Sequence, residues 1–210
     1  MKFKVDIVSD VVCPWCFVGK RRLEKAIAQL KDDEFEIDTL PFQLNPDLPD
    51  GEVLLRAYLG QKFGSIAQLE EMEERLEGIA STEGIAMDFS KITYVANTLK
   101  AHALIQSVKN LDQKMKLKEA LLSAYFEKGL RIGNDEVLKS VAKEQNVDYD
   151  ENFDAPEKVA QMRLSEQRLK EQGISAVPTF IINNRYLIQG AQPAETFVKA
   201  FEEIKAKESV

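Results

Sequence analysis

Both cysteines of this 210-residue chain, Cys13 and Cys16, lie in one short stretch, with only Pro14 and Trp15 between them. A disulfide between residues so close in sequence closes a short loop, so it removes little unfolded-state entropy and is a weak structural staple. A structural zinc site needs about four ligands, whereas the chain adds only one histidine, His102, to the pair. Zinc would therefore need carboxylates or a second chain, and we predict a metal-free pair that alternates between dithiol and disulfide.

The position of the pair relative to a helix predicts a role for each cysteine. If Cys13 is the N-cap, Pro14 takes the first helical position, which favours proline, and Cys16 takes the third. Free N–H groups and the helix dipole then stabilise a thiolate at Cys13. We expect Cys13 to be the exposed sulfur that exchanges with substrate, and Cys16, turned inward, to resolve the mixed disulfide. Pro14 and Trp15 lie nearest to the thiolate and are expected to tune it, with Trp15 partly exposed to substrate or to neighbouring helices.

The surrounding pattern supplies the elements that must position the pair. Residues 3–12 alternate and are rich in β-branched side chains, which predicts a strand. Apolar residues recur at helical spacing after Pro14, and residues 35–44 form a second predicted strand. The cysteines therefore lie at the strand-to-helix turn of a βαβ unit, the context in which C-x-x-C indicates a thioredoxin-like redox motif.

The C-terminal part of the chain predicts the other half of such a fold. Two strands, 177–183 and 185–190, flank an Asn183-Asn184 turn, and an amphipathic helix follows at 193–207. Pro178 falls near the start of its strand, where proline is allowed. A cis bond at this position, which X-Pro pairs permit, would turn the backbone outward beside the cysteines, where an extended peptide could pair with it.

The intervening segment is mostly helical in pattern. Its predicted helices have cap candidates at Ser65 and Asn134 and end near Gly129 and Gly173. We therefore predict the α/β class, with a thioredoxin-like fold (βαβ–ββα) and a large all-helical insertion. The expected thioredoxin-like domain is 1–45 and 173–210, and the inserted helical subdomain is 46–172, whose last helix, about 156–172, bridges back to the thioredoxin fold.

Composition limits the partners. The net charge of −7 argues against a nucleic-acid surface, which is usually basic. No stretch approaches the roughly 18 apolar residues of a membrane span, and the first ten residues do not resemble a signal peptide, so we expect a cytoplasmic protein with no membrane partner. Lys20, Arg21 and Arg22 are expected to form a solvated helix face.

Several segments together resemble a known family. "SDVVCPWCFVGKRRLEKA" and "GISAVPTFIINNRYLIQGAQP" are similar to the DsbA family of thioredoxin-fold proteins, specifically its FrnE-like branch. "PFQLNPDLP", "NTLKAHALI" and "LLSAYFEKGLRIGNDEVL" are similar to segments of that branch in the same order, so the resemblance covers nearly the whole chain. It implies a redox-active disulfide between Cys13 and Cys16, and a cis peptide bond at Val177-Pro178.

Asn97 and His102 belong to the segment "NTLKAH" and are candidate supporting residues. Five residues apart on a helix, they would not share one face. His102 has two interpretations: a hydrogen-bonded histidine at the subdomain interface, or a group that faces the cysteines and assists proton transfer.

Three functions compete at this stage. The first is a thiol–disulfide oxidoreductase that exchanges its CPWC dithiol with protein, peptide or glutathione partners, in either direction of electron flow and without a further cofactor. The second is a glutathione-dependent isomerase or transferase of the 2-hydroxychromene-2-carboxylate isomerase or kappa class. Those relatives generally carry a serine where this chain has Cys13, which favours the first. The third is a non-enzymatic peptide-binding or chaperone module. No oligomeric state follows from the sequence.

Overall fold

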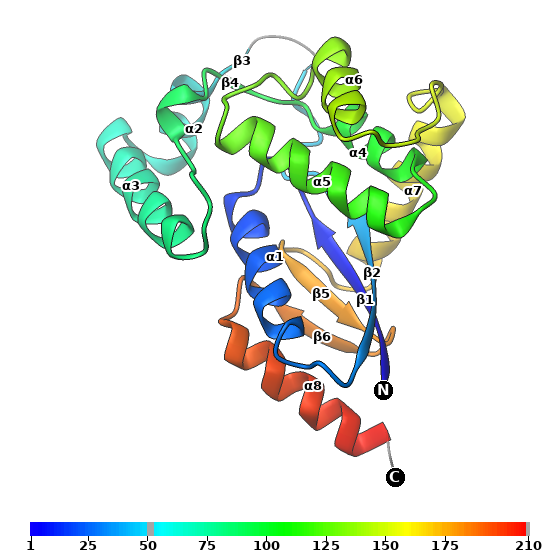
Figure 1. The fold of residues 1–210 in the computed structure, drawn as a ribbon. Coiled ribbons are helices and arrows are strands. Elements are labelled where there is room, and N and C mark those ends of the chain that lie inside the picture. Colours follow the sequence, from blue (N-terminus) through cyan, green and yellow to red (C-terminus); the bar gives the residue numbers. More distant parts are fainter. Residues whose placement is uncertain (50–52, 209–210) are drawn as a thin grey trace.

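The core of the molecule is a four-stranded sheet in the order β2-β1-β5-β6 (Figure 1). Strand β1 (Lys2–Ser9) is parallel to β2 (Glu34–Pro41) and antiparallel to β5 (Thr179–Ile182), which pairs with β6 (Tyr186–Gln189). Helix α1 (Pro14–Ile27) connects the parallel pair, and α8 (Ala194–Glu208) follows the hairpin. This βαβ–ββα order confirms the predicted thioredoxin-like fold.

The computed structural model describes residues 1–49 and 53–208. Residues 50–52, near the start of the expected insertion, and residues 209–210 lie outside the described part. The elements between β2 and β5 are β3 (Val53–Leu54), α2 (Leu55–Phe63), α3 (Ile66–Thr82), a 3-10 turn (Phe89–Lys91), β4 (Tyr94–Val95), α4 (Leu99–Ser107), α5 (Leu111–Phe126), α6 (Asp135–Glu144) and α7 (Pro156–Glu171).

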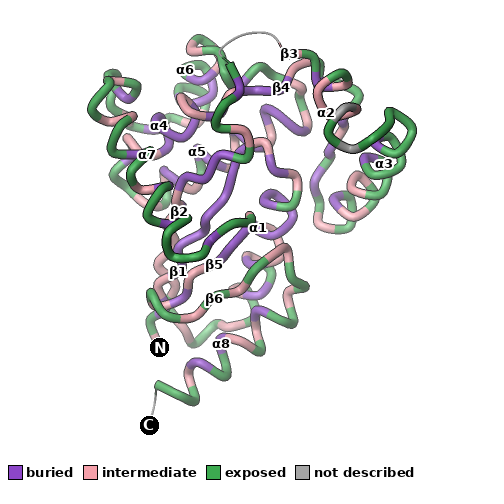
Figure 2. The backbone as a smooth tube through the Cα atoms, turned by 180° about the vertical axis from the view of Figure 1, so that it is seen from behind, coloured by how far each residue is buried: buried purple, intermediate pink, exposed green. Residues whose placement is uncertain are grey.

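The alternation of β1 explains how the sheet is covered on both faces. Phe3, Val5 and Ile7 are fully buried in a core that also contains side chains of α1, β5 and α8. Val8 points to the other face and joins a cluster with Leu169 of α7. Successive side chains of a strand point to opposite faces, so one strand serves two cores, and the middle of the sheet is largely buried (Figure 2).

The turn between β5 and β6 follows the sequence prediction. Asn183 and Asn184 have φ angles of 51° and 55°. Asparagine is one of the few residues that tolerates this left-handed region, and two such residues in a row suit a tight hairpin.

Helices α2 to α7 gather at one end of the sheet, whereas α8 and the N-terminus lie at the other (Figure 1). The largest apolar core joins the two regions, because it contains Val11, Phe17 and Val18 together with Leu104 and Leu121 of the inserted helices. The helical insertion is thus confirmed, but it is not all-helical as predicted, because it also contains the two-stranded β3–β4 sheet. Its residue boundaries stay a prediction.

Helix α2 was not expected from the sequence. Its N-cap is Leu54, which provides no side-chain cap, and its interior contains Gly60. Helices α3 and α6, in contrast, begin as predicted, with Ser65 accepting from Gln68 N–H and Asn134 accepting from the first turn of α6.

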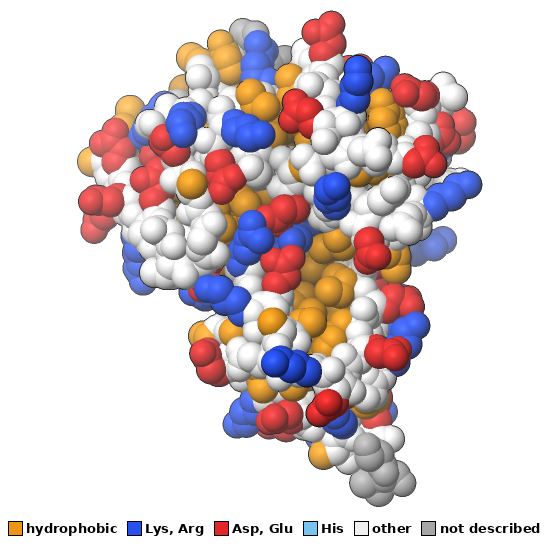
Figure 3. Space-filling model, viewed as in Figure 1, with side chains coloured by type: hydrophobic (Ala, Val, Ile, Leu, Met, Phe, Trp, Pro, Cys, Tyr) orange, Lys and Arg blue, Asp and Glu red, His pale blue; other side chains and the backbone are white. Residues whose placement is uncertain are grey.

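Acidic and basic side chains are interspersed over the face shown in Figure 3. Within residues 1–49 and 53–208, no helix combines the length and apolar character that a membrane crossing requires.

Candidate active site

The backbone places both cysteines at the start of α1. Cys13 is the N-cap, with φ −97° and ψ 110°, and Pro14 opens the helix. Cys16 N–H donates to Cys13 O at 3.0 Å, and Cys13 N–H donates to Asp10 O at 3.2 Å. Both sulfurs are free thiols in the structure. The local geometry therefore matches the predicted first turn of a helix with an unpaired N-terminal end.

Exposure of the cysteines differs from the sequence prediction in one respect. Cys16 is fully buried, as expected, but Cys13 is only 4% exposed and is not an open surface sulfur. Its Sγ lies 3.8 Å from Val177 O, which accepts a weak S–H hydrogen bond. The Val177-Pro178 peptide bond is cis. The Val177-Pro178 segment is more than a hundred residues from Cys13 in sequence. The tertiary fold therefore brings it over the Cys13 sulfur.

Cys13 is reached through a cavity of about 300 Å³. Cys13, Pro14 and Trp15 form one part of its wall, and Val177 contributes on the β5 side. Trp15 is 39% exposed, in agreement with the partly exposed position expected for it. The remaining wall is built largely by apolar side chains of the inserted region, among them Leu55, Leu59, Leu69, Met72, Leu76, Phe89, Ile92 and Phe126.

Lys118 of α5 is a buried cation near the pair that sequence analysis missed. It is 1% exposed, and its Nζ donates to Thr39 Oγ1 at 2.9 Å. Thr39 Oγ1 donates in turn to Ile7 O at 3.1 Å. Burial lowers the pKa of Lys118 to about 8. The signal was present in the sequence, since Lys118 shares the helical stripe of Leu117 and Leu121, which are buried.

Burial also raises the pKa of Cys16 well above its usual value, and the neighbouring Cys13 adds to this rise. The backbone of Asp10 and the charge of Lys118 act in the opposite direction and favour the Cys16 thiolate. A buried thiol can act as a nucleophile only after losing its proton. Lys118 is therefore placed to assist that loss.

His102 is bound to Asp10, not to either cysteine. Its Nε2 lies 3.1 Å from Asp10 Oδ1, and both side chains are buried. Asp10 Oδ2 accepts from Leu44 N–H at 2.8 Å. Asp10 was also missed by sequence analysis, although a carboxylate at the end of an apolar strand was the available signal.

Asn97 lies before α4 and not within a helix, contrary to the sequence interpretation. Its Nδ2 donates to Leu48 O at 2.7 Å, and its Oδ1 accepts from Leu99 N–H at 3.0 Å. These contacts hold the chain that enters α4, and they do not bring Asn97 to the cysteines.

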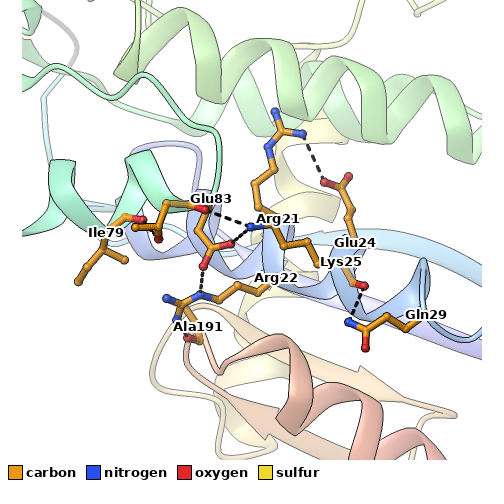
Figure 4. Close-up of polar contacts among 9 residues, drawn as sticks. Arg21, Arg22, Glu24, Lys25, Gln29, Ile79, Glu83 and Ala191 are labelled. Atoms are coloured by element: carbon orange, nitrogen blue, oxygen red, sulfur yellow. Dashed lines mark hydrogen bonds and ion pairs between the residues drawn. The ribbon is translucent and has the colours of Figure 1, made fainter.

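The basic residues of α1 form ion pairs with acidic residues of the fold, so the prediction of a solvated helix face is wrong. Lys20 is 4% exposed and pairs with Glu24 and with Glu119 of α5, at 2.5 and 2.6 Å. Arg21 also pairs with Glu119. On the other side of the helix, Arg22 Nε donates to Glu83 Oε1 at 2.6 Å, as Figure 4 shows. The prediction failed because contacts with distant parts of the chain bury this face of α1, and the local sequence pattern does not show such contacts.

Among the described residues, no group of three or more His, Cys, Asp or Glu side chains is arranged to hold a metal ion. The reactive groups that the structure brings together are the two sulfurs, with Lys118 on the inner side and the cavity on the outer side.

Comparisons with known proteins agree with this geometry. Residues 4–202 match the family model described as the DSBA-like thioredoxin domain. The uncharacterized protein YwbO of Bacillus subtilis is 28% identical over 99% of this chain and 100% of its own length.

Solved structures show the same fold. A structure described as a probable DsbA oxidoreductase from Streptomyces coelicolor has 29% identity and a TM-score of 0.83, covering 96% of this chain and 89% of that one. A 2-hydroxychromene-2-carboxylate isomerase structure has 13% identity and a TM-score of 0.68, covering 98% of each chain. At that identity, the second likeness concerns the fold alone.

Proposed function

Because the chain belongs to the DsbA-like thioredoxin domain family, we propose that it is a thiol–disulfide oxidoreductase of the FrnE-like branch. The observation that carries the proposal is the pair itself: Cys13 caps α1 and lines a cavity, while Cys16 lies fully buried one turn later. An outer sulfur that meets substrate and an inner one that does not are the two parts that disulfide exchange requires.

In the reductive direction, the Cys13 thiolate attacks one sulfur of a substrate disulfide. A Cys13–substrate disulfide forms, the substrate S–S bond breaks, and the other substrate sulfur leaves as a thiolate. Cys16 loses its proton and attacks Cys13, which releases the second substrate thiolate and forms the Cys13–Cys16 disulfide. Two electrons pass to the substrate. In the cytoplasm, where we place the protein, a low-molecular-weight thiol such as glutathione or a partner dithiol would return them. The reverse sequence oxidises a dithiol substrate.

The substrate chain is proposed to lie along Val177. Pro178 has no N–H, and its carbonyl already accepts from Gly190 N–H at 2.8 Å. The backbone of Val177 lies next to Cys13 Sγ, and its carbonyl, which accepts only a weak S–H hydrogen bond there, is proposed to pair with an extended peptide.

The test compares three proteins in the reduction of insulin by glutathione. Wild-type protein is expected to turn over, and Cys13→Ser is expected to have no activity. Cys16→Ser, incubated with insulin in the absence of glutathione, is expected to stop after one step and accumulate a Cys13–substrate disulfide, which mass spectrometry detects. Turnover by Cys13→Ser at the wild-type rate would end the proposal and direct attention to glutathione-dependent isomerisation.

A further inference from the structure

Glu73 of α3 lines the cavity that leads to Cys13, and one of its side-chain oxygens has no hydrogen-bond partner among the described residues. The residue is 6% exposed and lines the same cavity as Cys13. Its Oε2 pairs with Arg56 Nη1 at 3.1 Å. Its Oε1 is buried and has no hydrogen-bond partner among the described residues. A buried acceptor without a donor is unfavourable, and more so for a charged group, so the arrangement needs a reason.

The groups around Glu73 favour the binding of a cationic group beside it. Burial raises the pKa of Glu73, and the nearby carboxylates Glu70 and Glu77 raise it further, while Arg56 opposes them. Arg56 is shared, because its Nη1 also lies 3.4 Å from Glu70. Arg56 is therefore divided between two carboxylates, Glu70 and Glu73, and cannot neutralise both.

Lys62 is the cation in the described lining of the cavity, and it has other contacts. Its Nζ donates to Asn45 Oδ1 at 3.2 Å and lies 5.9 Å from the centre of the Tyr58 ring. The side chain is exposed at the edge of α2. Within residues 1–49 and 53–208, no hydrogen bond or ion pair joins it to Glu73.

The rest of the wall near Glu73 is apolar. Three apolar residues of α3 line the cavity close to Glu73 in sequence. Leu69 precedes Glu73 by four residues, Met72 is adjacent to it, and Leu76 follows it by three. An aliphatic stem can lie along such a surface while its charged end reaches a polar group, as lysine and arginine side chains commonly do. A cavity of about 300 Å³ is at the small end of ligand sites and suits one such side chain beside the disulfide.

We propose that this cavity selects disulfide-bonded polypeptides with a lysine or arginine close to the reacting cysteine, whose cationic end binds Glu73 Oε1 and whose methylene stem lies on Leu69, Met72 and Leu76. The inference rests on the proposed function and names its substrate class. Glutathione, with two carboxylates and one ammonium group, is disfavoured beside Glu73 relative to a cationic peptide.

The position of Glu73 relative to Cys13 is held by a second set of contacts. Glu83, just after α3, accepts from Arg22 Nε and from Lys25 Nζ, each at 2.6 Å, and both donors belong to α1 (Figure 4). The helix that carries Glu73 is thereby fastened to the helix that Cys13 caps. A binding group that is fixed relative to the reacting atom is what selectivity requires.

The test uses Cys16→Ser protein, in which Cys13 is the only cysteine, and symmetric disulfide dimers of short peptides. Lysine, norleucine or glutamate is placed at each of the four positions within two residues of the peptide cysteine. The rate of Cys13–peptide disulfide formation is followed by mass spectrometry. At the best position, lysine is expected to react about tenfold faster than norleucine, the factor that one charge-assisted hydrogen bond of about 1.4 kcal/mol supplies. Glutamate is expected to be slowest.

Two variants in the same background locate the effect. Glu73→Gln is expected to bring the lysine-to-norleucine ratio close to one, and Glu74→Gln, an exposed neighbour with the same change in charge, is expected to keep it. If Glu73→Gln does not fold, Leu76→Lys gives the answer instead, because it supplies a cation one turn from Glu73 and should remove the preference. Equal rates for the three peptides at every position would overturn the inference while leaving the oxidoreductase proposal intact. No peptide disulfide on Cys13 at all would instead mean that the oxidoreductase proposal fails.

Discussion

His102 Nε2 and Asp10 Oδ1 lie 3.1 Å apart, with both side chains enclosed in the interior. His102 belongs to α4 of the insertion, whereas Asp10 belongs to the turn between β1 and α1. The carbonyl of Asp10 accepts from Cys13 N–H. One side-chain contact thus connects the inserted helices to the backbone that holds the reactive cysteine, and it gives His102 a positioning role.

Replacing His102 by alanine tests that role. The free energy of unfolding is expected to fall by about 1–3 kcal/mol, because Asp10 Oδ1 is left buried without its partner. The pH dependence of Cys13 alkylation is expected to keep its midpoint, since His102 does not contact either sulfur. Chemical denaturation and iodoacetamide kinetics measure the two quantities. A midpoint displaced by one pH unit or more would show that His102 acts in proton transfer and not in positioning.

Close packing of α1 against the Val177-Pro178 segment depends on Gly19. A Cβ at this position would lie 3.0 Å from Pro178 Cγ and 3.2 Å from Phe180 Cζ. Gly19→Val is expected to lower the free energy of unfolding by about 1–3 kcal/mol through overpacking. It should also slow the reaction of Cys13 with peptide disulfides, because the displaced segment carries Val177.

Gly78 offers a control position for Gly19. It lies within α3, and a Cβ there would meet nothing within 4 Å. Gly78→Ala is expected to stabilise the protein by about 0.5–1 kcal/mol, since glycine is unfavourable inside a helix. Thermal and denaturant unfolding of both variants measures the contrast. A stable, fully active Gly19→Val protein would contradict the close approach of the two segments.

The sequence was sufficient for the parts of the site that local rules govern. Proline at the first helical position and the C-x-x-C spacing predicted the helix start at Cys13, and hydrophobic periodicity predicted most of the elements that surround it. The groups that sequence analysis missed are those whose roles depend on distant contacts. Lys118 and Glu73 look like ordinary charged residues of surface helices until the fold buries them. The sequence did predict the Val177-Pro178 backbone beside the cysteines, but not that Cys13 would be only 4% exposed beneath it.

Lys118→Met tests the inner side of the site. The positive charge of Lys118 lowers the pKa of Cys16, so its removal should raise that pKa further and reduce the thiolate that resolves the mixed disulfide. Resolution is expected to slow about threefold for each unit of that rise, because the tenfold loss of thiolate is partly offset by the greater nucleophilicity of a more basic thiolate, so the Cys13–substrate disulfide accumulates near neutral pH. Quenched reactions analysed by mass spectrometry measure its lifetime.

Lys114→Met is the control for this experiment. Lys114 lies one turn earlier on α5, is also buried, and pairs with Asp38 at 2.9 Å. Its loss removes the same charge and is expected to reduce stability while leaving resolution unchanged. If both variants slow resolution equally, the effect belongs to the net charge of α5 and not to Lys118.

Titration of Lys118 also predicts how stability depends on pH. Its pKa is about 8 in the folded protein, against an ordinary value of 10.5. Between these values the unfolded chain binds a proton that the folded chain does not, so stability rises as pH increases from about 8 to about 10.5.

The comparison is made between Cys16→Ala and Cys16→Ala/Lys118→Met, because the raised pKa of Cys16 gives the opposite slope and is absent from both. Relative to the double variant, Cys16→Ala should gain stability with rising pH, by about 3 kcal/mol at 1.36 kcal/mol per unit. Because the Cys16 thiolate that favours protonated Lys118 is absent, Lys118 titrates at or below pH 8 in this variant. The pH range over which stability rises is then wider, and the direction of the change is the same. Urea unfolding at a series of pH values measures the difference. A difference that is flat, or that shrinks as pH rises, would mean that Lys118 is not buried as a cation with a lowered pKa.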